Sequence, residues 1–173
     1  MPDPELSVVT TLYNSSPYID EFFERLAKVA SEITDSFEVI FVNDGSPDVA
    51  LEKVVALHRR DPRGCVVDLS RNFGHHQAIM AGMGHARGDR VFLIDVDLEE
   101  PPELLGEFHQ VMMEKQADVV YGVQERRKGG LFERISGWVF FRIFNWLSTH
   151  PVPPNFLTVR LMTQRYVEGL LQH

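Results

Sequence analysis

The chain has 173 residues and a formal net charge of −8, with 44% hydrophobic and 24% charged residues. These fractions are those of a globular protein with a buried core, and they argue against disorder as the main state. The negative charge argues against a nucleic-acid backbone as partner, because such a partner needs a clustered basic surface.

Strand-like and helix-like patterns alternate from the start of the chain, as in a parallel sheet covered by helices. Apolar runs rich in β-branched residues predict strands at residues 6–12, 37–42, 65–69, 91–94 and 118–123. Helical spacing, with serine and proline start signals, predicts helices that begin near Ser15, Ser46, His75 and Pro102. The sequence therefore predicts an α/β fold with a mostly parallel sheet and helices on both faces.

The third of these helices, residues 75–86, is rich in small side chains. Ala78, Ala81, Gly82 and Gly84 permit a close approach to the sheet, at some loss of helix propensity. We therefore expect this helix to pack tightly against the strands.

The amino-acid composition of the sequence changes after Val123. Residues 124–130 form a basic, glycine-containing loop, and the apolar side chains of the helix expected at 131–147 cover most of its circumference. This helix is too short and too charged to span a membrane. It either lies in a membrane interface, over residues 131–148, or packs against protein outside this chain. Residues 159–171 are expected to form a strand end followed by a helix.

Two carboxylates follow the strand at 91–94. Asp95 and Asp97 lie one residue apart, and would point to the same face if the strand continued through them. Glu99 is placed to complete an oxygen shell that keeps positions open for phosphate. The pattern predicts a divalent cation at the end of a buried strand, and the alternative is an acidic loop that caps the next helix.

Polar residues also follow the second and third strands. Asp44 has a carboxylate suited to the N–H groups of a nucleobase, and the alternative is an Asx turn or helix cap. Arg71 suits a phosphate, or an ion pair with Asp44 or Asp95. Because parallel strands end at the same edge of a sheet, these residues are expected to share one crevice. No glycine-rich phosphate loop is present, so phosphate binding here would depend on a metal ion.

Two further clusters have weaker interpretations. Adjacent side chains on a helix point about 100° apart, so His75 and His76 make a poor chelating pair, and packing or capping is expected. The dense basic patch at residues 126–128 indicates an anionic partner or a solvated loop.

Cys65 is the only cysteine, which excludes a disulfide framework and fits a reducing compartment. With polar residues before the first apolar run, no signal peptide is expected, and a cytoplasmic protein is predicted.

Four ordered motifs resemble family 2 glycosyltransferases. They are Ser7–Asn14, Val42–Ser46, Ser70–Gly74, and Asp95-Val-Asp97 followed by Pro101-Pro102. The chain is most similar to the polyprenyl-phosphate branch, which includes dolichyl-phosphate mannose synthase. The resemblance covers nearly the whole chain and implies a GT-A fold, a UDP- or GDP-linked sugar donor and inverting transfer. It also implies a nucleotide-sugar-binding domain over residues 1–130, and the start of an acceptor-side segment over 131–173.

The resemblance further implies roles for individual residues. Asp95, Asp97 and Glu99 would be the catalytic acids that ligate Mg²⁺ or Mn²⁺, with Asp95 also near the ribose. The residues implied at the nucleotide are Leu12, Tyr13, Asn14, Asp44, Arg71 and Asp95. The residues implied at the acceptor or a phosphate are Arg126, Arg127 and Arg160.

The chain departs from the branch at two positions. Gln124 stands where the branch often has an arginine, and Thr158 stands where an aspartate is common. A lipid phosphate is already an anion and needs no general base, so Thr158 fits a polyprenyl-phosphate acceptor. Family members run on past His173, so the chain is expected to be truncated.

The protein is expected to be peripheral on the cytoplasmic membrane and able to form a homo-oligomer. The competing interpretations are a transferase acting on a sugar hydroxyl in polysaccharide synthesis and a non-catalytic nucleotide-sugar-binding module. A nucleotidyltransferase is a further alternative. It would usually carry a glycine-rich basic loop after the first strand, which residues 13–16 are not.

Overall fold

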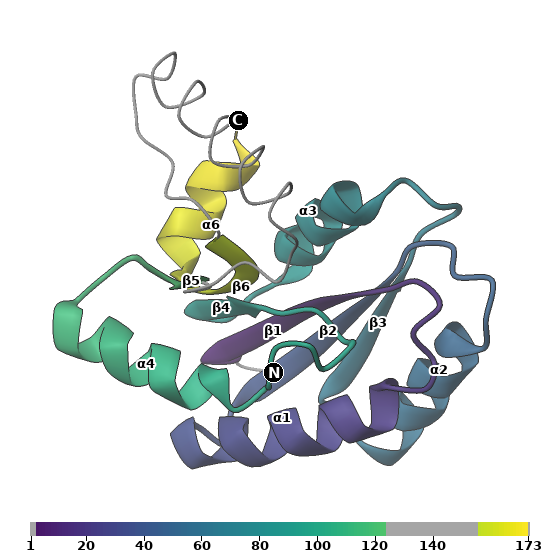
Figure 1. Ribbon diagram of the computed structural model, residues 1–173, viewed down its shortest axis with the longest axis horizontal. Coiled ribbons are helices and arrows are strands. Elements are labelled where there is room, and N and C mark those ends of the chain that lie inside the picture. The colour runs from purple at the N-terminus through teal and green to yellow at the C-terminus, as the bar shows by residue number, and fades with distance from the viewer. Residues whose placement is uncertain (1–2, 124–155, 173) are drawn as a thin grey trace, which may run out of the picture. The chain divides into compact units, whose positions relative to one another are not determined.

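The computed structural model of the protein describes residues 3–123 and 156–172 (Figure 1). Its strands are β1 (Leu6–Leu12), β2 (Phe37–Asn43), β3 (Gly64–Asp68), β4 (Arg90–Leu93), β5 (Val119–Val123) and β6 (Phe156–Thr163). Its helices are α1 (Ile19–Ile33), α2 (Ala50–Arg60), α3 (His75–His85), α4 (Leu104–Lys115) and α6 (Gln164–Leu171). The order of elements expected from the sequence is confirmed for these residues.

The chain divides into two compact units, one of Met1–Val120 with Thr158–His173 and one of Tyr121–Leu157. The site described below lies within the first unit. The helix expected over 131–147 lies outside the described residues, and the domain boundary expected at residue 130 stays a prediction. Within the described parts of the chain, no helix has both the length and the apolar character needed to cross a membrane.

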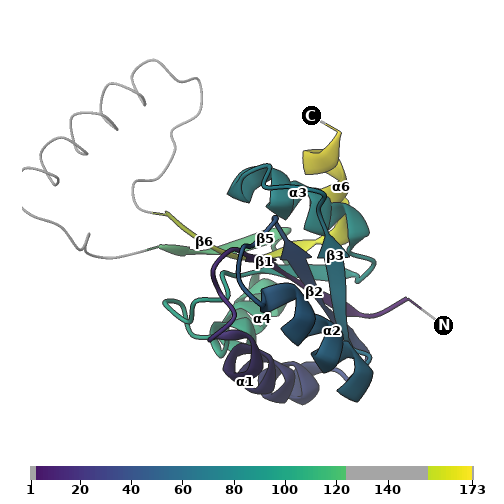
Figure 2. The ribbon, with the colours of Figure 1, turned by 90° about the vertical axis from the view of Figure 1, so that its right-hand side faces the viewer.

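The six strands form one sheet in the order β3-β2-β1-β4-β6-β5. β1 pairs in parallel with β2 and with β4, β2 pairs in parallel with β3, and β4 pairs antiparallel with β6. Helices α1, α2 and α4 cover one face of this sheet, and α3 and α6 cover the other (Figure 2). The predicted mostly parallel sheet with helices on both faces is confirmed.

Burial on both faces explains the composition of the central strands. Every residue of β2 and all but one of β1 are buried, which is why these strands are apolar runs rather than alternating patterns. On one face the side chains of Val9, Val42, Val91 and Met162 join those of α3 and α6 in a single apolar cluster. This core holds the strands that carry the polar loops described below.

The register aligns the strand ends. Leu12 of β1 pairs with Asn43 of β2, and Asn43 pairs with Asp68 of β3. β4 ends at Leu93, opposite Val9 of β1. The loops that follow β1, β2, β3 and β4 therefore leave from one edge of the sheet, which we call the carboxyl edge.

The helix starts expected at Ser15 and Ser46 are wrong. α1 begins at Ile19 and α2 at Ala50, and neither has a side-chain cap. The Ser46 hydroxyl instead accepts the Asn14 N–H at 2.8 Å and donates to Asp48 at 2.6 Å. This serine therefore ties the loop after β2 to the loop after β1, and leaves no oxygen in position to cap a helix.

Replacing Gly82 with alanine is expected to destabilise the protein, whereas the same change at Gly84 is expected to stabilise it. A Cβ at Gly82 would lie 2.5 Å from Val9 Cγ1 and 2.8 Å from Val42 Cγ2, while a Cβ at Gly84 meets nothing within 4 Å. The first collision should lower the free energy of unfolding by about 1–3 kcal/mol. Removing a helical glycine at the second site should raise it by about 0.5–1 kcal/mol. Urea unfolding of both variants measures the difference, and equal effects would contradict the tight packing of α3.

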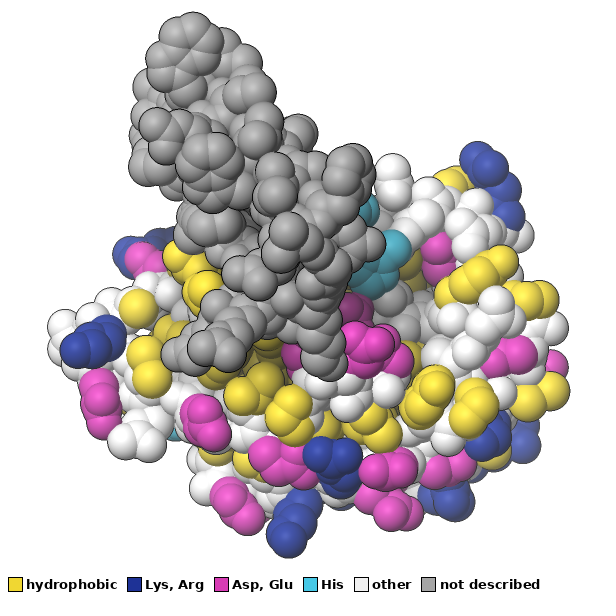
Figure 3. Space-filling model, in the orientation of Figure 1, with side chains coloured by type: hydrophobic (Ala, Val, Ile, Leu, Met, Phe, Trp, Pro, Cys, Tyr) yellow, Lys and Arg dark blue, Asp and Glu magenta, His cyan; other side chains and the backbone are white. Residues whose placement is uncertain are grey.

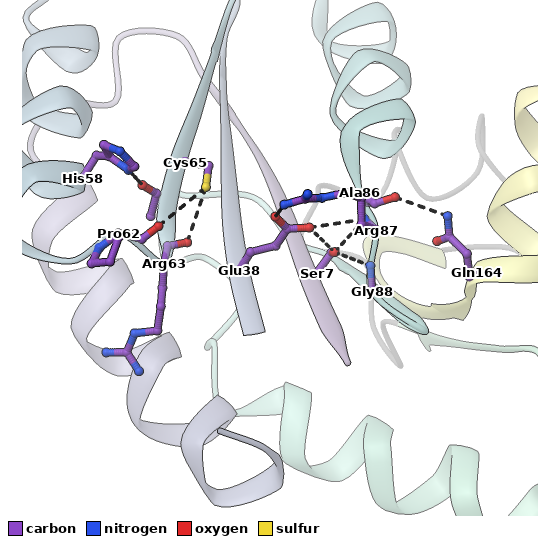
Figure 4. A network of polar contacts seen from close by, with 11 residues as sticks. Ser7, Glu38, His58, Pro62, Arg63, Cys65, Ala86, Arg87, Gly88 and Gln164 are labelled. Atoms are coloured by element: carbon purple, nitrogen blue, oxygen red, sulfur yellow. Dashed lines mark hydrogen bonds and ion pairs between the residues drawn. The ribbon is translucent and has the colours of Figure 1, made fainter. Parts of the chain in front are cut away.

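At the other end of the strands, opposite the carboxyl edge, a polar network centred on the buried Ser7 and Glu38 holds the chain in place (Figure 4). The Ser7 hydroxyl donates to Glu38 Oε1 at 2.7 Å, and its oxygen accepts the N–H groups of Arg87 at 3.1 Å and Gly88 at 2.8 Å. Arg87 also donates from its guanidinium to Glu38 Oε2 at 3.4 Å. These bonds attach the turn between α3 and β4 to β1 and β2, and so set the position from which β4 carries its acidic loop.

Candidate active site

Four loops meet at the carboxyl edge, and the loop after β4 is the most acidic of them. Acidic and histidine side chains lie close to one another on the face shown in Figure 3. The loops come from successive parallel strands, which is where open α/β sheets bind ligands. The residues expected at this edge are taken below in the order of the strands.

The loop after β1 presents an aromatic ring. Tyr13 is 53% exposed, and Asn14 has a positive φ of 53°, a conformation that asparagine tolerates. Leu12 differs from expectation, because its side chain is fully buried and its carbonyl accepts the Asp44 N–H at 3.1 Å. The roles of Leu12, Tyr13 and Asn14 at a nucleotide stay predictions.

Asp44 joins the loop after β2 to the loop after β3. Its side chain is buried, and its two oxygens accept the N–H groups of Phe73 at 2.7 Å and Gly74 at 3.0 Å. The carboxylate thus bridges to a different loop, rather than forming the Asx turn or helix cap considered as the local alternative. Each carboxylate oxygen has a second acceptor position, so the predicted contact with a nucleobase stays a prediction.

Gly45 allows the backbones of the loops after β2 and β3 to approach each other closely. Its φ is +61°, and a Cβ placed on it would lie 2.5 Å from the Asn72 backbone nitrogen and 2.7 Å from the Arg71 carbonyl carbon. Only glycine lets the two backbones approach to this distance. The loops after β2 and β3 therefore form a single rigid wall of the site.

Arg71 lies on this wall and is exposed. Its guanidinium stacks over the Phe73 ring at 4.4 Å. Among the described residues it forms no ion pair with Asp44 or Asp95, so that alternative is wrong. The predicted contact with the nucleotide stays a prediction.

The acidic loop after β4 is a turn, not a continued strand. β4 ends at Leu93, Leu98 has a positive φ of 64°, and Asp97 Oδ1 accepts the Glu99 N–H at 3.0 Å. The strand does not continue through Asp95 and Asp97, so the condition for the same-face argument is not met. Asp95 is half-buried, whereas Asp97 and Glu99 are exposed.

Both ends of the acidic loop are anchored. At its start the Ile94 N–H donates to the Val9 carbonyl at 3.2 Å. At its end Glu103 receives two bonds from Arg25 of α1, at 2.9 Å from Nε and 2.7 Å from the terminal nitrogen. A two-point guanidinium–carboxylate contact fixes orientation as well as distance. The acids between these anchors are thus held in a loop of defined path.

Two acids of this loop, Asp95 and Glu100, have a raised pKa. Burial raises the pKa of Asp95, and the charges of Asp97 and Glu99 add to it, against His75 and a hydrogen bond from Thr158 that lower it. Burial likewise raises the pKa of Glu100, together with the charges of the other three acids. The loop therefore carries more negative charge than its surroundings neutralise.

The carboxylates of the acidic loop suit a divalent cation that also binds phosphate. Mg²⁺ prefers oxygen ligands and is usually held by one or two carboxylates with water or substrate phosphates. In the parts of the chain that the structure describes, no three His, Cys, Asp or Glu side chains come together closely enough to enclose an ion. The residues therefore fit an open site completed by a ligand, and the assignment of Asp95, Asp97 and Glu99 as its ligands stays a prediction.

His75 lies beside the acidic loop at the first position of α3, and the packing or capping expected for it stays a prediction. Its ring lies between Thr11 of β1, at 3.1 Å, and Asp95, at 3.6 Å. The position of His75 directly after Gly74, at a carboxyl-edge loop, was the available signal in the sequence. Its partners are distant in the chain, so local spacing could not reveal them.

Of the arginines expected at the acceptor, only Arg160 lies among the described residues. It pairs with Leu93 across β4 and β6, and its Nε donates to the Thr158 carbonyl at 3.0 Å. Its role at a phosphate stays a prediction. Arg126 and Arg127 lie outside the described residues.

The sequence matches known proteins along most of its length. Residues 7–166 match the family described as Glycosyl transferase family 2. A protein of Mycobacterium tuberculosis (strain CDC 1551 / Oshkosh) named "Putative glycosyltransferases" is 50% identical over 168 residues, 97% of this chain and 49% of the relative. The undecaprenyl-phosphate 4-deoxy-4-formamido-L-arabinose transferase of Serratia proteamaculans (strain 568) is 35% identical over 135 residues, 77% of this chain and 41% of the relative.

The fold matches a solved glycosyltransferase. The mannosyltransferase PcManGT from Pyrobaculum calidifontis, in complex with GDP-Man and Mn²⁺, superposes with a TM-score of 0.64 over 97% of this chain and 47% of the other, at 17% identity. The expected GT-A fold is thereby confirmed. The chain spans about half the length of the curated relatives it matches. It belongs to glycosyl transferase family 2.

Proposed function

We propose that the chain is the donor-binding and catalytic part of a metal-dependent, inverting glycosyltransferase. Its acceptor is a polyprenyl phosphate at the cytoplasmic face of a membrane. One observation carries this proposal: four mutually repelling acids follow β4, next to a loop pair that Asp44 locks together at the same sheet edge.

The donor is a UDP- or GDP-linked sugar. Tyr13, Asn14 and Asp44 lie at one part of the carboxyl edge, where a base can stack on the exposed ring and bond to polar groups. The diphosphate belongs at the acidic loop, where Asp95, Asp97 and Glu99 would hold Mg²⁺ or Mn²⁺. PcManGT, which shares the fold, has GDP-Man and Mn²⁺ bound.

The bound cation supplies Lewis-acid stabilisation of the negative charge that develops on the leaving diphosphate. In the transfer itself, an oxygen of the acceptor phosphate attacks the anomeric carbon from the face opposite the leaving group. The bond between that carbon and the donor's phosphate oxygen breaks, and the nucleoside diphosphate leaves with the electron pair. The configuration of the anomeric carbon is inverted.

Thr158 supports a phosphate acceptor. A sugar hydroxyl must lose a proton to a general base as it attacks, whereas a lipid phosphate is already ionised. The Thr158 hydroxyl lies near Asp95, whose pKa it lowers, and it is no base at neutral pH. The relative from Serratia proteamaculans is named for transfer to undecaprenyl phosphate. In this proposal Arg126, Arg127 and Arg160 contact the acceptor phosphate, and residues 131–148 lie on the membrane.

A sugar hydroxyl is the second candidate acceptor, and one observation favours it. The pKa of Glu100 is raised by burial and by its acidic neighbours, which is the condition for a carboxylate that takes up a proton. Transfer to a sugar acceptor that is lost in a Glu100→Gln variant would support this candidate. Retained transfer to a polyprenyl phosphate by the same variant supports the first.

Thermal unfolding with a panel of UDP- and GDP-sugars tests the donor site directly. One donor is expected to raise the Tm by on the order of 5 °C at about 100 times its Kd, and only with Mn²⁺ present. Addition of EDTA should abolish the shift, and Mn²⁺ alone is the control. An equal shift without the metal ion would contradict the metal dependence, and no shift with any donor would contradict the donor site.

A further inference from the structure

His75 is the first residue of α3, and its ring bridges two strand ends of the sheet. Nδ1 lies 3.1 Å from the Thr11 hydroxyl of β1, and Nε2 lies 3.6 Å from Oδ1 of Asp95, which follows β4. β1 and β4 are neighbours in the sheet. The imidazole therefore connects a strand residue of the nucleotide side to an acid of the proposed diphosphate side.

The chemistry of the two partners decides which nitrogen carries the proton in the neutral ring. A carboxylate only accepts hydrogen bonds, whereas a hydroxyl both donates and accepts. A neutral imidazole has one donor and one acceptor nitrogen. A hydrogen on Nε2 faces the Asp95 carboxylate favourably across 3.6 Å, which leaves Nδ1 to accept from the Thr11 hydroxyl at 3.1 Å.

Asp95 is held from its other side as well. Thr158 of β6 lies near its side chain and lowers its pKa, and β6 is the other neighbour of β4 in the sheet. The polar groups of Thr11, His75, Asp95 and Thr158 thus form a chain across three adjacent strands. Such a chain restricts the rotamer of Asp95, as the hydrogen-bond partners of metal-ligating side chains do.

We propose that His75 is a positioning residue that holds the Asp95 carboxylate in the orientation needed by the metal-bound donor. The Asp95 carboxylate favours the Nε2–H tautomer, the Thr11 hydroxyl donates to the Nδ1 that is left, and His75 orients Asp95. This inference rests on the proposed function, since it assigns Asp95 to the donor site.

The neighbouring His76 supplies a matched control. It is exposed like His75, lies on the same turn of α3, and its ring meets that of His75 edge-on at 5.7 Å between centroids. Its side chain points about 100° away around the helix axis. A change at His76 therefore removes an imidazole from the same turn of α3, without removing either polar contact of the His75 ring.

Calorimetric titration of the nucleoside diphosphate in the presence of Mn²⁺ measures the effect. His75→Ala is expected to weaken binding by about 10- to 100-fold, the usual effect of removing a partner of a metal ligand. His75→Gln should restore most of the affinity, because its amide N–H₂ reaches the position of Nε2–H. His75→Asn, with a shorter side chain, should not, and His76→Ala should bind like the unaltered protein.

A second measurement needs no ligand. Long-range ¹H–¹⁵N NMR spectra of the imidazole, recorded in mildly alkaline buffer, should show the Nε2–H tautomer for His75, and Thr11→Val should reduce that preference. The Nδ1–H tautomer would overturn the proposal. So would unchanged affinity in His75→Ala, or an equal loss in His75→Ala and His75→Gln.

The two proposals fail in different ways. If the unaltered protein does not bind any nucleoside diphosphate with Mn²⁺, the proposed function falls, and the donor role of His75 falls with it. If the unaltered protein binds and His75→Ala binds equally well, only the role of His75 is overturned. The tautomer measurement tests the Thr11–His75–Asp95 contact in either case.

Discussion

Replacing Asp97 with alanine is expected to abolish the Mn²⁺-dependent binding of the sugar nucleotide. Asp97 is the exposed acid in the middle of the acidic loop, where it can reach an ion shared with a diphosphate. A cation of this kind is held by only one or two carboxylates, so the loss of one should weaken donor binding by about 100-fold or more. Calorimetry with and without Mn²⁺ measures the change.

A second variant separates the charge of Asp97 from its place in the turn. Asp97→Asn keeps an oxygen that can accept the Glu99 N–H, but it removes the negative charge. Both variants should therefore lose metal-dependent binding, and Glu107→Ala, which removes an exposed acid of α4, should retain it. Unchanged affinity in Asp97→Ala would refute the metal assignment. Binding retained by Asp97→Asn alone would instead assign Asp97 to loop structure.

Replacing Gly45 with alanine is expected to cause the largest loss of stability among single changes at the carboxyl edge. The added Cβ collides with the backbone of Asn72 at 2.5 Å, and the φ of +61° is strained for alanine. Neither backbone can move without breaking the bonds from Asp44 to Phe73 and Gly74. Together these effects should lower the free energy of unfolding by about 2–5 kcal/mol, as measured by urea denaturation.

Gly45→Asn distinguishes the two causes of this loss. Asparagine tolerates a positive φ better than alanine does, but it carries the same Cβ. If the collision dominates, both variants are destabilised to a similar extent, and metal-dependent donor binding weakens in both because the wall of the site is displaced. An asparagine variant as stable as the unaltered protein would show that φ strain alone makes glycine necessary here.

The order of strands and helices could be predicted from the sequence, because buried parallel strands and amphipathic helices leave distinct apolar patterns. The starts of α1 and α2 could not be predicted in this way. Serines before each helix suggested caps, yet Ser46 bonds to Asn14 and Asp48 across the edge of the sheet. A cap is a local contact, and here contacts with another loop replaced it.

The position of the site was predicted for the same reason as the fold. Asp44, Arg71 and Asp95 each follow a parallel strand, and the register brings the ends of those strands to one edge. What these side chains touch there could not be predicted. Asp44 binds backbone groups near Phe73, and His75 meets Thr11, through contacts between distant parts of the chain that no spacing in the sequence encodes.

The antiparallel pairing of β6 with β4 has a consequence for how the protein is made. β4 lies between β1 and β6, so its outer edge stays unpaired until residues 160–163 have left the ribosome and bonded to it. An open apolar strand edge is a template for pairing with other chains. Any nascent or proteolysed chain that ends before β6 therefore exposes Val91 and Phe92 on an unprotected strand, which favours aggregation.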